Sequence, residues 1–528
     1  MSETRAPLIP DGGLSRRDFL RLTGATVGGL ALAGIPDLSD AASPKRGGTL
    51  RLGNTADVVS FEPYAVSDNV SIWTMLLIYD QLTRPTTDGL SLQPGLAKSW
   101  DISKDGKTYT FHLRTDVKFH DGTPLTAADV KFCVERAAFA KNTQWAFILA
   151  ALKSMEVVDK HTVRAHLKQP HAPFLSDMAL FATSIYPAAL FHKEGTKLWA
   201  HPVGTGPFKF QSWKRGSQVN LVRNPHFWRN PNQPYVNAFQ NLVVPDANTR
   251  VLQVQSGELD IALFVPPAQA KTLQHSSSVT VHVDNFMDSH FVTLNVTKKP
   301  LNDVRVRQAL NYAIDKDAIV SKILFGFGTP SGQALPKMWG ADPNVKPYPY
   351  NPAKAKSLLK AAGHSSGLKL TCLVDASIAT DQQVATLMQE QLRAIGVNMQ
   401  IKIIEEGTLL KIIENKPFNY EMSPGYMTSD IIDPDELISF AVAGDAGTYA
   451  IWTLYNNAKV NNLSKQAASE ANKSKRLKMY YEIDTIHHDD APMIFLYRTP
   501  SLTLTTSKVQ GFKVLPTGNY RLEEVWLS

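Results

Sequence analysis

A strand–helix–strand unit at residues 368–403 constrains the fold of this chain more than any other part of its sequence. Residues 368–374 form a short apolar run that suits a buried strand, and residues 397–403 alternate apolar with polar side chains. Between them, residues 381–395 repeat apolar side chains at helical spacing and end at Gly396. Strands joined through a helix pair in parallel by a right-handed crossover. The unit therefore predicts an α/β fold.

Helix start and stop signals mark further elements of the same kind. Residues 246–257 begin with an N-capping Asp246 and end in a glycine, and residues 351–363 carry an Asn-Pro start and a glycine stop. Apolar side chains recur at helical spacing from Val304 to Leu324, which predicts one long helix. No internal repeat accompanies these segments, so we expect lobes of mixed α/β structure.

Short strands between tight turns are predicted around residues 96–129. Two alternating runs flank an Asp-Gly pair at 105–106, and this pair accepts the positive φ that a hairpin turn requires. A second Asp-Gly turn follows at 121–122, and Thr126 with Asp129 resembles a capping box that opens a helix. We expect a compact β-rich region here.

The N-terminus has the layout of an export signal. Arg16 and Arg17 precede an uncharged run at residues 22–36, and a small-x-small site ends at Ala41. This order resembles the twin-arginine signal, which is read by a translocon for folded proteins. The run is shorter than the roughly 20 residues of a membrane-spanning helix, and residues 1–41 contain no cysteine for a lipid anchor. We therefore expect the signal peptide 1–41 to be removed and the mature chain to be a soluble periplasmic protein.

Composition and charge exclude several other classes of protein. The 528 residues are 43% hydrophobic and 20% charged, which argues against extensive disorder. The net charge is +7, but Lys and Arg are interspersed with Asp and Glu and no nucleic-acid-binding motif accompanies them. We therefore expect no nucleic-acid partner. Cys133 and Cys372 are too few for a disulfide framework and are expected to be small buried residues.

The common motifs of catalysis and metal binding do not occur in the sequence. It contains no Gly-x4-Gly-Lys-Ser/Thr phosphate loop, no Gly-x-Ser-x-Gly elbow and no His-Glu-x-x-His zinc helix. His487-His488-Asp489-Asp490 gathers metal-ligand types, but neighbours on a helix point about 100° apart, so a solvated helix end is expected there. We expect no enzyme activity, no cofactor and no metal. The alternative, a secreted hydrolase, would require a nucleophile–base pair that the sequence does not display.

A series of short motifs runs in a set order along roughly residues 47–500. Its members include Tyr79-Asp80-x-Leu82, Leu96-Ala97-x-x-Trp100, Lys118-Phe-His120-Asp121-Gly122-Thr-Pro124, Pro202-Val-Gly204-Thr-Gly206-Pro-Phe208, Asn224-Pro-x-x-Trp228, Asp303-Val-Arg-Val-Arg-Gln-Ala-Leu310 and Asp433-Pro434-Asp435. The series resembles the extracellular solute-binding proteins of family 5, the dipeptide and oligopeptide receptors of ABC importers. It covers nearly the whole mature chain.

This resemblance implies a periplasmic-binding-protein-like type II fold, with two α/β lobes around a hinged cleft and an extra β-rich domain. Lobe I would comprise residues 44–80, 204–286 and 493–528, the extra domain residues 81–203, and lobe II residues 287–492. The resemblance also implies a monomer that closes on a small solute, above all a peptide. Such a receptor delivers its solute to an ABC permease and ATPase complex in the inner membrane.

The same resemblance points to ligand-binding residues. Asp430, three residues before the Asp-Pro-Asp motif, matches the aspartate that pairs with the ligand's ammonium group in peptide-binding relatives, and Tyr426 would line the cleft. Ser67, Asp68 and Asn69 match a lobe I segment that contacts the ligand. A turn-capping aspartate, a core aromatic residue and ordinary loop chemistry are the structural alternatives for these positions.

One departure from the family bears on the ligand. Dipeptide binders carry an arginine for the ligand's carboxylate between a strand and a helix of lobe II, whereas residues 374–381 here contain no arginine. Longer peptides, or other cationic or uncharged solutes, are therefore expected. A metal chelate, an opine or an oligosaccharide stays open as the ligand, with Trp73, Trp339 and Trp452 available to stack on a sugar. A chaperone for exported polypeptides would share the same fold and a tolerant cleft.

Overall fold

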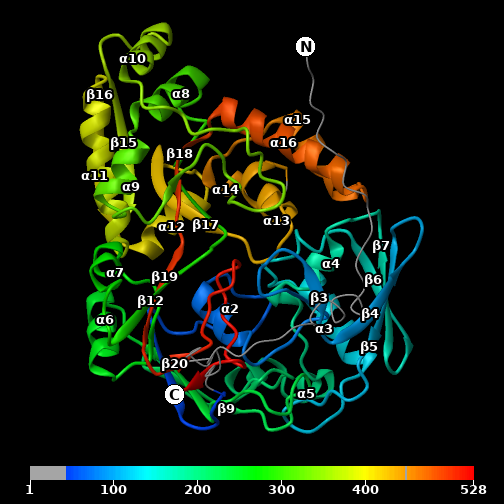
Figure 1. Ribbon diagram of the computed structural model, residues 1–528. Coiled ribbons are helices and arrows are strands. Elements are labelled where there is room, and N and C mark those ends of the chain that lie inside the picture. The colour runs from blue at the N-terminus through cyan, green and yellow to red at the C-terminus, as the bar shows by residue number, and fades with distance from the viewer. Residues whose placement is uncertain (1–42, 446–448) are drawn as a thin grey trace, which may run out of the picture. The chain divides into compact units, whose positions relative to one another are not determined.

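The computed structural model describes residues 43–445 and 449–528, drawn in colour in Figure 1. The predicted signal peptide 1–41 lies outside the described residues. Within those residues, three sheets of four or more strands carry the fold, and helices pack between and around them. No helix of the described part is long and apolar enough to cross a bilayer.

The first sheet combines strands from the beginning, the middle and the end of the described chain. Its strand β1 (Thr49–Asn54) buries Leu50 and Leu52 and pairs in parallel with β10 (Ala238–Val243) and β11 (Ile261–Ala262). The order is β12-β19-β11-β1-β10-β9-β8, where the others are β8 (Phe208–Lys214), β9 (Gln218–Arg223), β12 (Val279–Asp284) and β19 (Ser501–Thr506). Because β1 reaches partners almost 200 residues away, the sheet depends on tertiary pairing.

The second sheet contains the predicted strand–helix–strand unit. β15 (Leu368–Asp375) pairs in parallel with β16 (Val397–Ile404) over its whole length, and α11 (Ala379–Arg393) connects them, so the prediction is confirmed. The order is β14-β18-β13-β17-β15-β16, where the others are β13 (Asp288–Leu294), β14 (Thr329–Pro330), β17 (Met422–Thr428) and β18 (Met493–Arg498).

The third sheet lies in the region predicted to be β-rich. Its order is β4-β5-β7-β6, formed by β4 (Ala97–Ile102), β5 (Thr108–Leu113), β6 (Leu152–Asp159) and β7 (Thr162–Leu167). The predicted hairpin is confirmed, since β4 and β5 are antiparallel and Gly106 between them has a φ of 67°. The capping box of Thr126 and Asp129 is also confirmed and opens α3 (Ala127–Phe139).

Further described elements connect and cover these sheets. They are β2 (Thr83–Pro85), β3 (Leu92–Pro94), β20 (Val509–Gln510), β21 (Trp526–Leu527), α2 (Asn69–Met75), α4 (Phe174–Asp177), α5 (Ala188–Glu194), α6 (Ala247–Ser256), α7 (Pro267–Leu273), α10 (Pro352–Ala361), α12 (Glu406–Glu414), α13 (Asp435–Leu437), α14 (Tyr449–Trp452), α15 (Ala458–Ser469) and α16 (Lys473–Asp490). α6 and α10 begin and end where their capping signals predict.

The single helix predicted for residues 304–324 is wrong. The chain forms two helices there, α8 (Val304–Ala313) and α9 (Lys316–Lys322). Asp315 caps α9 by accepting a hydrogen bond from the backbone N–H of Ala318, and Ile314 before it is extended. The local cap therefore overrides the continuous apolar pattern.

The histidines near the end of α16 are not solvated, which corrects another expectation. His487 is 1% exposed and packs edge-on against Tyr455 and Phe495, while His488 stacks on Tyr348. Burial lowers the pKa of His487 to about 3, so its ring is neutral. This face of α16 is covered by the second sheet and its neighbours.

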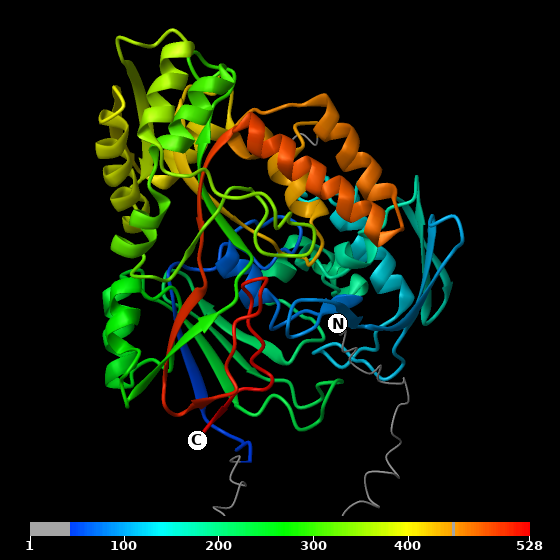
Figure 2. The ribbon, with the colours of Figure 1, turned by 45° about the horizontal axis from the view of Figure 1, so that its top comes forward.

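Two chain crossings connect the first and second sheets. Residues 285–287 lead from β12 to β13, and residues 499–500 lead from β18 to β19; both run between the sheets in Figure 2. β18 pairs with β13 and β14 in the second sheet, so the assignment of residues 493–498 to lobe I is wrong and the chain crosses after Arg498.

The side chain of Asp288 joins the two crossings. Its carboxylate accepts hydrogen bonds from the backbone N–H of Thr499 at 2.9 Å, from the Thr499 hydroxyl, and from Nε2 of His290 at 2.9 Å. Asp288 is 1% exposed, so water does not replace these donors.

We expect Asp288→Ala to lower the free energy of unfolding by about 3 kcal/mol. The variant leaves the half-buried donors of Thr499 and His290 without their charged acceptor, and hydrogen bonds to charged groups contribute roughly 1.5–3 kcal/mol each. Urea unfolding followed by circular dichroism measures the effect. Glu390→Ala, an exposed change on α11, is the matched control and should stay within about 0.5 kcal/mol of the wild type. Equal midpoints for both variants would contradict the role of Asp288.

Candidate functional site

A cavity of about 60 Å³ lies where the loop after β17 meets elements that surround the first sheet. Its wall includes Ile72 and Trp73 of α2, seven residues from Leu76 to Pro85, five residues from Thr517 to Glu523 of the C-terminal segment, and Asp430. By this measure one water needs about 10–15 Å³, so the cavity holds a few waters or one small polar group. The wall residues up to Pro85 precede the first crossing, Asp430 lies between the two crossings, and the C-terminal segment follows the second.

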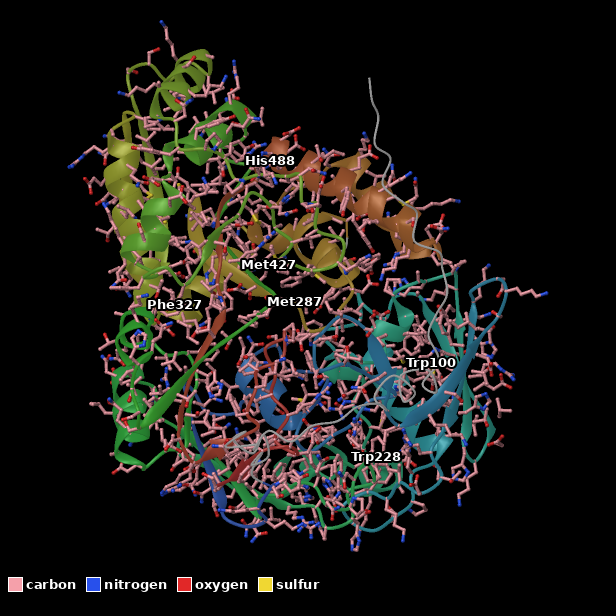
Figure 3. The ribbon with its side chains drawn as sticks, in the orientation of Figure 1. Trp100, Trp228, Met287, Phe327, Met427 and His488 are labelled. Atoms are coloured by element: carbon pink, nitrogen blue, oxygen red, sulfur yellow. The ribbon has the colours of Figure 1, made fainter. Side chains whose placement is uncertain are left out.

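Asp430 brings an acidic group to this cavity. β17 ends at Thr428, and Ser429 then donates its backbone N–H to the carbonyl of Met287 at 3.1 Å, beside the first crossing. Figure 3 labels Met287 and Met427 close together at this place. Burial raises the pKa of Asp430 above the usual range of an aspartate. Its ionised carboxylate is therefore costly in the cavity wall unless a cation compensates it.

Glu436 positions this loop and was not identified from the sequence. Its Oε2 accepts hydrogen bonds from Ser429 Oγ at 3.0 Å, from the backbone N–H of Asp430 at 3.0 Å and from that of Ile431 at 3.1 Å. Glu436 is 3% exposed, and burial together with the charge of Asp430 raises its pKa well above the usual value. The only signal in the sequence was its place directly after the Asp-Pro-Asp motif.

Two arginines line the same cavity, and the sequence analysis did not single them out. Arg84 lies in β2, and Arg521 lies in the C-terminal segment. Arg84 Nη2 is 3.1 Å from Oε1 of Glu523, which also lines the cavity. The cavity wall thus contains both acidic and basic groups.

The structure places Tyr426 in a different group of side chains. It lies on β17, is 45% exposed, and does not line the cavity with Asp430. Its ring stacks on His290, with the ring centres 5.7 Å apart, and His290 stacks on Tyr497 at 4.7 Å. Tyr426 therefore forms part of an aromatic row on the second sheet.

Acidic residues occupy the position where dipeptide-binding relatives are expected to carry an arginine. Asp375 ends β15 and Asp381 lies in the first turn of α11. Asp381 is 7% exposed, and burial followed by the charge of Asp375 raises its pKa to about 6, while His290 lowers it. The negative charges of Asp375 and Asp381 are unfavourable for a carboxylate placed between β15 and α11.

The segment of residues 67–69, predicted to contact the ligand from lobe I, makes a structural contact through Asp68. Asp68 caps α2, because its Oδ1 accepts a hydrogen bond from the backbone N–H of Ser71 at 2.8 Å. Ser67, Asp68 and Asn69 are not among the residues that line the cavity. Trp73, four residues later, does line it and is 3% exposed.

In the described part of the chain, no group of three or more His, Cys, Asp or Glu side chains is arranged to hold a metal ion. Both cysteines are buried and unpaired, 1% exposed or less.

Comparison with known proteins gives consistent matches over most of the chain. The profile of bacterial extracellular solute-binding proteins, family 5, matches residues 91–449. The glutathione-binding protein GsiB of Pectobacterium atrosepticum is 30% identical over 89% of this chain and 92% of its own length. The dipeptide-binding protein of Escherichia coli K12 is 31% identical over 85% of this chain and 88% of its own.

Solved structures show the same fold. A periplasmic binding protein DppA of Helicobacter pylori, in complex with the peptide STSA, has a TM-score of 0.82 and 29% identity, covering 92% of this chain and 98% of its own. The Agrobacterium tumefaciens protein AgaA, in complex with agropinic acid, has a TM-score of 0.81 and 26% identity, covering 91% and 99%.

We expect Glu436→Gln to become more stable relative to the wild type as the pH rises. The pKa of Glu436 is raised in the folded state, so its contribution to stability is complete below the unfolded value of about 4.3 and is lost as the pH rises. Glutamine stays neutral and its amide oxygen can accept the same hydrogen bonds. The difference in unfolding free energy should grow by up to about 1.4 kcal/mol per pH unit between pH 5 and 8. A difference that does not change with pH, measured by urea unfolding, would contradict this account.

Proposed function

Because the chain belongs to family 5 of the bacterial extracellular solute-binding proteins, the substrate-binding components of ABC importers, we propose that it captures a peptide, or a peptide-like solute with a free amine, and delivers it to a membrane permease. The resemblance found in the sequence motifs is confirmed, as is the α/β fold class. Family members are binding proteins, so the chain is proposed to bind its solute without chemical change.

The observation that carries the proposal is the half-buried carboxylate of Asp430 in the cavity wall. Burial raises its pKa, and the described residues place no arginine or lysine in hydrogen-bond contact with it. An ammonium group of a solute would supply the missing positive charge and the hydrogen-bond donors. Three of the ligands named for the relatives, glutathione, dipeptides and the peptide STSA, carry such a group.

Capture is proposed to occur by closure of two lobes. Lobe I comprises residues 44–80, 204–286 and 499–528, the extra domain residues 81–203, and lobe II residues 287–498. The two crossings at 285–287 and 499–500 support this division, because they are where strands pass from the first sheet to the second. A solute that contacts both lobes binds the closed state better and shifts the population toward it.

The site of action is proposed to be the periplasm. The paired Arg16 and Arg17, followed by the uncharged run, support export by the twin-arginine translocon, and the chain is proposed to act there as a monomer.

We expect replacement of both Arg16 and Arg17 by lysine to leave the precursor in the cytoplasm, because the translocon reads the arginine pair. Cell fractionation followed by immunoblotting measures the distribution. Arg21→Lys in the same segment is the matched control and should be exported normally. Normal export of the wild-type chain in cells that lack only the twin-arginine translocon would contradict the proposed route.

We expect Asp430→Asn to weaken binding of the peptide Ser-Thr-Ser-Ala by about 10- to 100-fold. An ionic hydrogen bond to an ammonium group contributes roughly 1.5–3 kcal/mol, and 1.4 kcal/mol is a factor of ten. N-acetylation of the peptide should cause a similar loss in the wild type and no further loss in the variant. Asp489→Asn, an exposed change on α16, is the control. Titration calorimetry gives the dissociation constants.

The pH dependence provides a second readout of the same contact. The ammonium binds the ionised carboxylate, and burial raises the pKa of Asp430, so protons should compete and wild-type affinity should fall as the pH drops from 8 to 5.5. In Asp430→Asn this dependence should be much smaller. If neither Asp430→Asn nor N-acetylation changes the affinity for the peptide, the amine contact lies elsewhere.

A further inference from the structure

We propose that Asp381 and Tyr426 form a cation subsite at the edge of the second sheet. It binds a basic side chain of the solute, the ammonium group of a lysine or the guanidinium group of an arginine. The proposal rests on the proposed function, because it takes the solute to be a peptide, and it adds a contact separate from that of Asp430. It makes peptides with a basic residue the preferred substrates of this receptor.

Tyr426 lies at one end of the row of aromatic rings on the second sheet. His290 of β13 stands opposite Tyr426 of β17 on one side and opposite Tyr497 of β18 on the other. The rings of Tyr426 and His290 are stacked, and yet 45% of Tyr426 remains exposed to solvent. An exposed tyrosine ring at the end of such a row is a binding surface for a cation, because the face of the ring is electron-rich.

The side chain of Asp381 points from α11 toward the face of the sheet that carries this row. Val384 and Ala385, one turn later on the same side of the helix, are buried in the core that α11 forms with the sheet. Met422 belongs to the same core, and Tyr426 lies four residues later on the same face of β17, because alternate side chains of a strand share a face. α11 also packs directly against β17. The carboxylate and the tyrosine ring therefore lie on the same side of the sheet, at the end of this core.

The carboxylate of Asp381 lacks a partner. Asp381 is 7% exposed, and among the described residues its side chain forms no hydrogen bond and no ion pair. It does not cap its own helix, since α11 has no side-chain cap. His290, the nearest titratable group of opposite charge, directs its Nε2 to Asp288 at 2.9 Å. A buried carboxylate without a partner is costly, and a cation of the solute would compensate it.

Two further acidic residues, Asp375 and Glu406, add negative charge around Asp381. Asp375 ends β15, and Glu406 follows the end of β16, the strand paired in parallel with it. Burial raises the pKa of Asp381 and of Glu406, and the charge of Asp375 raises both further. In the part of the chain that the structure describes, none of the three carboxylates forms an ion pair. Ligands of α/β sheets bind outside the carboxyl ends of the strands, and here this edge favours a cation.

One peptide reaches both this subsite and Asp430. β17 carries Tyr426 and ends two residues later, and Asp430 follows in the next loop. Four residues of extended chain span at most about 14 Å, which bounds the distance between the two positions. A peptide whose amine binds Asp430 and whose lysine or arginine lies near the N-terminus therefore fits both contacts.

Matched peptides test the subsite by titration calorimetry. Ser-Lys-Ser-Ala should bind the wild type about tenfold more tightly than the same peptide with norleucine, an uncharged analogue, in place of lysine. Asp381→Asn should remove most of this preference. Tyr426→Leu should reduce it about threefold, while Tyr426→Phe keeps the ring and most of the preference. Glu390→Gln, which removes an exposed charge from the same helix, is the matched control. Equal affinity of the lysine and norleucine peptides for the wild type would overturn the proposal.

The stability of Asp381→Asn distinguishes binding from a structural role. Because the variant removes an unpaired buried charge, its urea midpoint without peptide should be equal to or above that of the wild type. A midpoint clearly below the wild type would show that Asp381 supports the fold and would overturn its assignment to the solute.

Asp430→Asn separates the subsite from the amine contact. It should weaken binding of both peptides and leave their ratio of affinities unchanged, whereas Asp381→Asn should change the ratio. Loss of the ratio in Asp381→Asn, together with unchanged affinities in Asp430→Asn, would contradict the amine contact and support the subsite. A ratio that is the same in Asp381→Asn as in the wild type would overturn the subsite.

Butylguanidinium chloride tests the subsite without a peptide, since it carries one cation and no peptide group. Its saturation-transfer NMR signal should be similar with the wild type and Asp430→Asn and strongly reduced with Asp381→Asn. An equal signal with Asp381→Asn would overturn the subsite. A signal that depends on Asp381 in a protein that binds no peptide would contradict the proposed function and leave the cation subsite intact.

Discussion

The carboxylate of Asp288 is the contact on which the arrangement of the rest depends. It lies at the start of β13, directly after one crossing between the sheets, and it binds Thr499 in the other crossing. The same crossing orders the loop that carries Asp430, through the carbonyl of Met287, and orders the C-terminal segment, through the backbone N–H of Met287 and the carbonyl of Pro516. Asp430 and the C-terminal segment that carries Arg521 are therefore both held beside the place where the chain crosses between the first and second sheets.

Electrostatics explains what this cavity selects. Asp430 is held by Glu436 in a position where its charge is poorly solvated, and Arg84, paired with Glu523, lies in the wall of the same cavity. The charge of Asp430 is unfavourable in the absence of an opposite charge, and the amine of a solute compensates it. Asp375 at the end of β15 and Asp381 in the first turn of α11 oppose a carboxylate between them.

Much of the fold could be predicted because its signals are local. The hairpin at Gly106, the capping box of Thr126 and the parallel pairing of β15 with β16 follow from turn chemistry, capping and periodicity. The wrong predictions concern residues whose surroundings are set by other elements of the fold. Residues 493–498 belong to the second sheet because β13 lies beside them, and His487 is buried because other elements cover α16. Of the predicted site residues, Asp430 lies in the cavity wall, whereas Tyr426 and Asp68 make other contacts.

The sequence by itself determined the family, through an ordered series of motifs, and the ends of α6 and α10, through caps that involve residues within one turn of each other. It also identified Asp430 as a candidate ligand-binding residue. Only the tertiary structure decided that this aspartate shares a cavity with Arg84 and Arg521. These arginines are separated by more than a hundred residues along the chain, and no short-range pattern relates them. Their proximity follows from long-range strand pairing, whose partners a local pattern does not specify.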